Sequence, residues 1–173
     1  MTDSFAHHLR LDRIHDGERI DLVADESERT AIARRIGLSG LERLEAHASF
    51  ARKGEVVEVN GRVLASLEQS CVVTGEPVPA HLDEPFDVVF MPEPETSRSE
   101  EELELGPADV DVVFHDGSTI DLGAAVAYTL ALSLNPYPRS AGADAALKEA
   151  GVLPEAEASP FAALAKLMKD DSA

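Results

Sequence analysis

Alternating apolar and polar residues form the clearest pattern in the chain and predict a long β-hairpin. Odd-numbered positions from Val57 to Val73 are mostly apolar, whereas the even-numbered positions between them are mostly polar. A turn signal at residues 74–77 follows, and alternation resumes from Val78 to Phe90. We expect residues 55–73 and 78–90 to pair as antiparallel strands. A strand this long must bend or bulge, and Gly61 is the natural position.

Shorter alternating runs predict further strands over residues 5–14, 18–23, 44–52 and 109–120. A helix over residues 26–36 is predicted between a capping box, formed by Asp25 and Glu28, and a stop at Gly37. A second helix over residues 122–134 begins after Asp121, which can cap it. Apolar residues recur along this second segment with a spacing of four, at Leu122, Val126, Leu130 and Leu134.

These elements predict an α+β domain over residues 1–139, in which an antiparallel sheet, curved or partly barrel-like, packs against two helices. An acidic stretch after Met91 is expected to be a solvated loop. Residues 140–173 form a predicted flexible acidic tail, because large apolar side chains are scarce between residues 140 and 159. The tail ends in a short amphipathic helix whose apolar face either docks on its own domain or binds a partner. That face carries Phe161, Leu164 and Met168.

Composition suits one cytoplasmic domain. No apolar run is long enough to span a bilayer, and the N-terminus lacks the pattern of a secretion signal. The formal net charge is −18, of which −2 falls in residues 1–62 and −16 in residues 63–173. Such acidity argues against a large phosphate-binding surface and favours basic protein partners, although it also serves solubility. The best candidates for RNA contact, or else ordinary surface cations, are Arg34, Arg35, Arg52, Lys53 and Arg62.

Catalytic and metal-binding patterns are absent from the sequence. The single cysteine, Cys71, lies on the apolar face of its predicted strand and is expected to behave as a small buried hydrophobe rather than a nucleophile or metal ligand. The histidines are scattered, and acidic pairs arise by chance among 33 Asp and Glu residues. We therefore expect no enzymatic activity, no cofactor, no metal and no small-molecule substrate.

Several short motifs resemble the YceD-like family, which is linked to accumulation of large-subunit ribosomal RNA. They are Gln69-Ser-Cys71, Glu76-Pro77, Phe86-Asp-Val-Val-Phe90, Ile120-Asp121-Leu122-Gly123 and the segment from Leu130 to Pro136. Many members of the family have what looks like a Cys-x-x-Cys motif at the hairpin, and some add a later cysteine cluster. This chain has Thr74 and Arg139-Ser-Ala-Gly instead, so a zinc-binding role is not carried over.

The resemblance implies a non-enzymatic accessory factor in ribosome biogenesis, which supports synthesis, processing or stability of large-subunit ribosomal RNA. Its partner would be that RNA or, given the acidity, a basic ribosomal protein or assembly factor. The alternatives are an acidic adaptor or nucleic-acid mimic that occupies the basic site of another protein, and an uncharacterised hydrolase.

Overall fold

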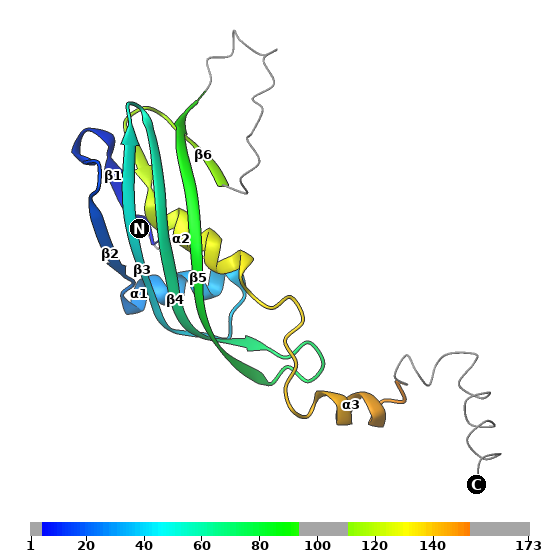
Figure 1. Cartoon of the computed structure of the whole chain (residues 1–173). Coiled ribbons are helices and arrows are strands. Elements are labelled where there is room, and N and C mark those ends of the chain that lie inside the picture. The colour runs from blue at the N-terminus through cyan, green and yellow to red at the C-terminus, as the bar shows by residue number, and fades with distance from the viewer. Residues whose placement is uncertain (1–4, 94–110, 153–173) are drawn as a thin grey trace, which may run out of the picture. The chain divides into compact units, whose positions relative to one another are not determined.

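The computed structural model describes residues 5–93 and 111–152 (Figure 1). Contacts divide the chain into two units, which are described separately. Unit 1 comprises Met1–Gln69 and Pro79–Pro136, and unit 2 comprises Ser70–Val78 and Tyr137–Ala173. The acidic loop expected after Met91 lies almost entirely outside the described residues. The expected helix with Phe161, Leu164 and Met168 lies entirely outside them. Within those residues, no helix is long and apolar enough to cross a membrane.

A five-stranded sheet forms most of unit 1. Its strands lie in the order β2 (Arg19–Val23), β3 (Gly40–Lys53), β4 (Val56–Ser70), β5 (Pro77–Pro92) and β6 (Asp111–His115). The pairs β2–β3 and β3–β4 are antiparallel. Strand β5 runs opposite to β4, since Asn60 bonds Asp87 while Ser66 contacts His81. The predicted long hairpin and the α+β class are confirmed.

Strand β6 departs from the expected antiparallel order, because it pairs parallel to β5, with Val88 opposite Asp111 and Pro92 opposite His115. Parallel neighbours need a long return connection, and residues 94–110 provide the length for one. The sheet is open, with β2 and β6 at its edges.

The predicted strand over residues 109–120 is in fact two strands in different sheets. Strand β6 ends at His115, and β7 (Thr119–Asp121) pairs antiparallel with β1 (His8–Arg10). The chain turns between them at Gly117, whose φ is +85°. The N-terminal run is also shorter than predicted, because Leu11–Arg13 forms a 3-10 turn, η1.

Both predicted helices are present, and their predicted caps are confirmed. In α1 (Glu26–Ile36), Asp25 and Glu28 form the capping box, and Gly37 ends the helix in the left-handed conformation. In α2 (Leu122–Leu132), the Asp121 side chain accepts a hydrogen bond from the Ala124 amide at 3.0 Å. Figure 1 shows both helices behind the main sheet. We call the sheet face toward the helices the inner face.

The core lies on the inner face and follows the predicted alternation. The apolar residues of β4 and the stripe of α2 are buried together with alternate residues of β3 and β5, including Leu44, Val57, Val63, Phe90, Leu122 and Val126. A bulge at Gly61 was a wrong expectation, since Gly61 pairs with Ala48 in continuous register and the irregularity lies between Leu41 and Arg43. Glycine is needed there for space instead: a Cβ would collide with the His47 carbonyl oxygen and lie 2.6 Å from the Phe86 ring.

Unit 2 joins the turn after β4 to the chain that follows α2. The Cys71 amide donates to the Glu76 carbonyl at 2.7 Å, and the Val72 amide donates to the Pro138 carbonyl at 2.9 Å. A short helix, α3 (Ala143–Glu149), follows and buries Ala143. The sequence-based boundary at residue 139 falls inside the second segment of this unit.

Candidate functional sites

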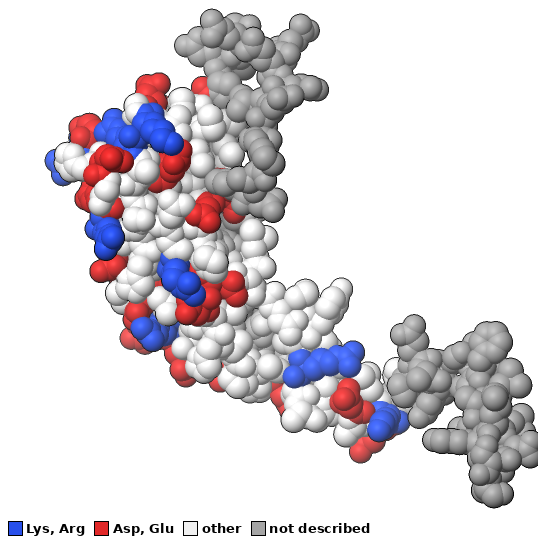
Figure 2. Space-filling view, in the orientation of Figure 1, with Lys and Arg blue, Asp and Glu red and all other residues white. Residues whose placement is uncertain are grey.

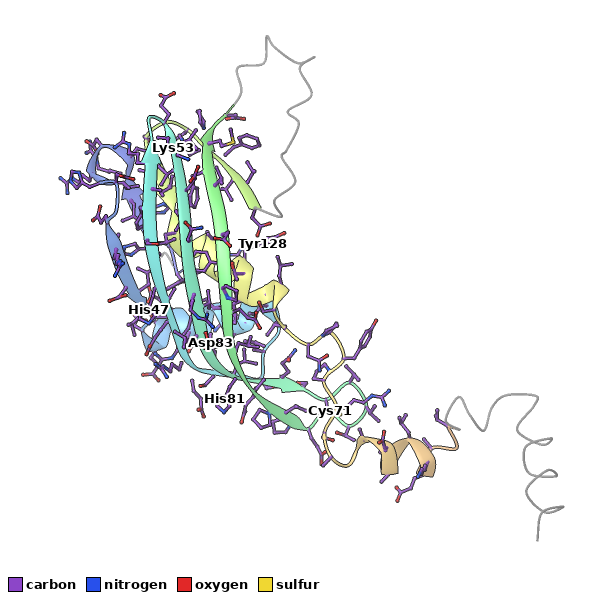
Figure 3. All side chains as sticks on the ribbon, viewed as in Figure 1. His47, Lys53, Cys71, His81, Asp83 and Tyr128 are labelled. Carbon is purple, nitrogen blue, oxygen red and sulfur yellow. The ribbon has the colours of Figure 1, made fainter. Side chains whose placement is uncertain are left out.

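A groove of about 590 Å³ opens in unit 1 between α2 and the inner face of β5 and β6. Its floor is made of core side chains, among them Val88, Phe90 and Ile120, which are each at most 3% exposed. Its walls include Val113 of β6 and Tyr128 of α2, which are 39% and 60% exposed. Tyr128 is labelled in Figure 3. We call this feature the β6–α2 groove.

Helix α2 is apolar on its outer side as well as on its buried side. It contains no charged residue between Leu122 and Leu132. Ala124, Tyr128 and Leu132 lie four residues apart and are exposed, so they form a second apolar stripe along the helix. A helix on the surface of a globular protein normally turns charged or polar residues outward. The outer stripe of α2 therefore has the character of a contact surface.

Carboxylates predominate at the rim of the β6–α2 groove. Asp111, Asp116 and Asp121 line it, together with the cation Arg35 and the imidazole of His8. The Asp111 side chain is exposed, and it has no hydrogen bond or ion pair with residues 5–93 or 111–152. Hydrogen bonds from the Ser118 hydroxyl and amide and from the Thr119 amide lower the pKa of Asp116 to about 2, so this carboxylate stays ionised at neutral pH.

The family motif residues Asp121, Leu122 and Gly123 form a structural junction beside this groove. The Asp121 side chain caps α2 and also accepts a hydrogen bond from the His7 amide at 3.0 Å. The Leu122 amide donates to the His7 carbonyl at 3.1 Å, and the Leu122 side chain is fully buried. A Cβ at Gly123 would lie 2.8 Å from the His7 nitrogen and collide with the Phe5 carbonyl oxygen. Glycine thus lets the N-terminal strand segment pass flat against the helix.

The five candidate RNA-binding cations do not gather in one patch. On the outer face of the sheet, Arg62 pairs with Asp83 at 2.7 Å, and at the end of β3 Lys53 pairs with Glu58 at 2.7 Å. Figure 2 shows positive and negative side chains interspersed on that face. The Arg52 guanidinium donates to three backbone carbonyls, among them Leu11 and Ile14, so it holds the η1 turn against β3.

Arg34 and Arg35 lie in the last turn of α1, where a positive charge is favourable to the helix dipole. Both side chains are exposed, and neither guanidinium has a hydrogen bond or ion pair within the described part of the chain. Arg35 lines the β6–α2 groove, whereas Arg62 is paired with Asp83 elsewhere on the sheet. The surface that remains for phosphate contact is therefore small, and RNA contact by these cations stays a prediction.

Cys71 is buried, as expected, but in unit 2 rather than in the core of the strand pair. It follows the last residue of β4 and is 3% exposed. The amides of Thr74 and Ser140 donate to its sulfur at 3.4 and 3.2 Å. Burial raises the pKa of this thiol, but the hydrogen bonds from Thr74 and Ser140 outweigh it and lower the pKa to about 6. No local pattern around Cys71 indicates the Ser140 donor, because Ser140 lies 69 residues further along the chain.

Thr74 and Ser140 lie beside each other near Cys71. Their hydroxyl oxygens lie 3.2 Å apart, and Thr74 also bonds the Glu76 carboxylate at 3.1 Å. Zinc sites in proteins are built from thiolates, imidazoles and carboxylates, so one thiol with two hydroxyls is a poor zinc-binding set. Among the described residues, no group of three His, Cys, Asp or Glu side chains could hold a metal ion. Hydrogen bonds connect this part of unit 2 instead.

Sequence reasoning missed the β6–α2 groove, because Tyr128 was considered only as part of its helix. A signal was present: Tyr128 and Leu132 lie off the predicted buried stripe in a segment without any charge.

Comparison with known proteins gives one family. A family model described as "Large ribosomal RNA subunit accumulation protein YceD" matches residues 59–168, which is more than half of the chain. That range covers the long hairpin, β6, β7, α2 and the described part of unit 2 beyond Pro136. No curated protein and no solved structure matches the chain.

Proposed function

We propose that this chain, which belongs to the YceD family, is an accessory factor that supports accumulation of large-subunit ribosomal RNA without catalysing a reaction. The family match carries the proposal, and the description of the family already names the RNA whose level would change. We place this action in the cytoplasm, where the large subunit would be assembled.

Contact with a basic protein is the route that we favour over direct RNA binding. The formal net charge of −18 repels a polyanion, and the cations Arg62 and Lys53 are paired with carboxylates. An acidic surface attracts basic ribosomal proteins and assembly factors, and it also screens their positive charge from nonspecific RNA contact. In this route the protein would raise the level of large-subunit RNA by assisting a protein that binds it.

The absence of a catalytic role is also part of the proposal. Among the described residues, the carboxylates at the β6–α2 groove are either exposed, as Asp111 is, or committed to backbone amides, as Asp116 and Asp121 are. A hydrolytic pair would need one carboxyl with a raised pKa and one with a lowered pKa, held across a cleft. At this rim, Asp116 has a lowered pKa rather than a raised one.

Depletion of the protein from cells tests the proposal. We expect the ratio of large-subunit to small-subunit ribosomal RNA to fall, and to recover when the full chain is supplied again. Affinity purification at increasing salt should recover large-subunit precursors through a protein contact, and nuclease treatment should leave that contact intact. A normal RNA ratio after depletion would contradict the proposal. Recovery of a single basic protein unrelated to ribosomes would favour the acidic adaptor instead.

A further inference from the structure

The β6–α2 groove combines an apolar floor, apolar walls and an acidic rim, and this combination selects for a particular class of ligand. We propose that the groove binds a segment of a basic protein in which apolar side chains are flanked by lysine or arginine. The inference deepens the proposed function and rests on it for the identity of the partner as a basic protein. The groove itself is assigned from the described residues of unit 1.

The floor and walls supply the apolar half of the recognition. Val113 pairs with Phe90 in the parallel ladder, so the two side chains point to the same face and extend the core surface to the sheet edge. Val113 is 39% exposed, and Tyr128 is 60% exposed across the groove. A volume of about 590 Å³ lies within the range of protein ligand sites and can hold several anchoring side chains. Aromatic residues such as Tyr128 are frequent anchors of binding energy at interfaces.

The rim supplies the charge that distinguishes one occupant from others. Three carboxylates, from Asp111, Asp116 and Asp121, face one guanidinium, from Arg35, with His8 as a further titratable group. The carboxylates of Asp116 and Asp121 are held in place by backbone amides, so they present negative charge without needing to reorganise. Lysine or arginine beside an apolar anchor would therefore find a carboxylate in reach.

A second copy of this chain is a poor occupant for the same reason. Each copy carries a formal net charge of −18, and self-association would bring acidic surfaces together. A basic segment would instead be attracted to the acidic surface. Charge complementarity thus favours a basic protein over self-association.

Binding of defined peptides to the full chain tests this inference. The probe is a short fluorescein-labelled peptide with alternating leucine and valine between pairs of lysines, measured by fluorescence anisotropy. One comparison peptide has glutamate in place of lysine, and another has serine in place of leucine and valine. We expect the lysine-flanked apolar peptide to bind at least about tenfold more tightly than either comparison peptide, because both halves of the recognition are required.

Substitutions of groove residues should weaken binding of the lysine-flanked peptide, and loss of an apolar anchor should weaken it more than loss of a rim charge. We expect Tyr128→Ser and Val113→Ser to weaken it about tenfold, as loss of an apolar anchor does. Asp111→Asn should weaken it about threefold and reduce its dependence on salt, as loss of a rim charge does. Matched controls are Val23→Ser, which changes an apolar residue of β2 that is 68% exposed, and Glu42→Gln, which removes an exposed charge from β3. Both controls should bind within about twofold of the unchanged protein.

Several results would overturn the inference. These are failure of the lysine-flanked peptide to bind, equal binding of the glutamate-flanked or serine peptide, and unchanged binding by Tyr128→Ser. A large fall in melting temperature of Tyr128→Ser or Val113→Ser would show that the chain itself covers the groove. Binding of an uncharged apolar dye in the groove without any peptide binding would identify a small-molecule site instead.

The cellular assay separates this inference from the proposed function. If Tyr128→Ser fails to bind peptide yet restores ribosomal RNA in depleted cells, the groove is not the functional surface and the accessory role stands. If depletion leaves ribosomal RNA unchanged while peptide binding behaves as expected, the accessory role fails and the groove remains a binding site for basic segments.

Discussion

Replacing Gly123 by alanine should have two opposite effects on stability at the start of α2. Higher helix propensity stabilises the protein, whereas closer packing destabilises it. In an exposed helix interior, alanine is more favourable than glycine by up to about 1 kcal/mol. At this position, however, the new Cβ would lie 2.8 Å from the His7 nitrogen, 2.9 Å from the Phe5 carbonyl carbon and nearer still to its oxygen. All three are backbone atoms, which cannot rotate away as the end of a side chain can.

The destabilisation by close packing is larger than the gain in helix propensity. Overpacking of a close contact costs about 1–3 kcal/mol, and contact with three backbone atoms belongs at the upper end. Relief by detachment of the N-terminal segment is no cheaper, because it loses the two hydrogen bonds that join His7 to Asp121 and Leu122, at about 1 kcal/mol each, and exposes Phe5. After subtraction of the propensity gain, we expect a net loss of about 2 kcal/mol in the free energy of unfolding.

Thermal denaturation followed by circular dichroism provides the measurement. For a chain of this size, a loss of about 2 kcal/mol lowers the melting temperature by about 4–8 °C. Gly40→Ala is the matched control, because its nearest neighbour would be the flexible Glu68 carboxylate at 3.4 Å. Hydrogen exchange at the amide of His7 would report whether the segment detaches. A Gly123→Ala protein as stable as the unchanged chain, or more stable, would refute the close-approach explanation.

Three further predictions concern other parts of the fold. Gly61→Ala should lower stability to urea by about 1–3 kcal/mol through contact with Phe86, and Phe86→Leu in the same chain should recover part of the loss. His115→Ala should cost about 2–3 kcal/mol by calorimetry, since this buried imidazole bonds backbone groups through both ring nitrogens. The thiolate absorbance of Cys71 should titrate with a midpoint of about 6. Because folding lowers this pKa, the thiolate contributes stability fully above about pH 9 and loses that contribution as pH falls through about 6, and a midpoint near 9 would contradict the hydrogen-bonded environment.

Features encoded by neighbouring residues could be predicted from the sequence. The capping box of Asp25 and Glu28, the stop at Gly37 and the cap at Asp121 each depend on a few adjacent residues, and all three are present. The alternation of β4 likewise depends only on which face is buried. The apolar stripe of α2 was predicted for the same reason, since its period reports the buried side of a helix directly.

Features decided by distant parts of the chain could not be predicted. The direction of β6 depends on where the chain returns after residues 94–110, and alternation is the same in parallel and antiparallel strands. The candidate cations are visible as charges, but the carboxylate that pairs with Arg62 is Asp83, on the next strand. The donors that surround the Cys71 sulfur include an amide from residue 140, which no local pattern indicates.

Pairing of β1 with β7 has a consequence for how the protein is made. His8 lies opposite Asp121, so the first strand of the chain finds its partner only after most of the chain has been synthesised. The β2–β3–β4 meander can form earlier, because its strands are close in sequence and such contacts are quick to close. On the ribosome, the N-terminal strand therefore waits unpaired while the central sheet assembles, and closure of the β1–β7 pair by the emerging Asp121 is a late step of folding.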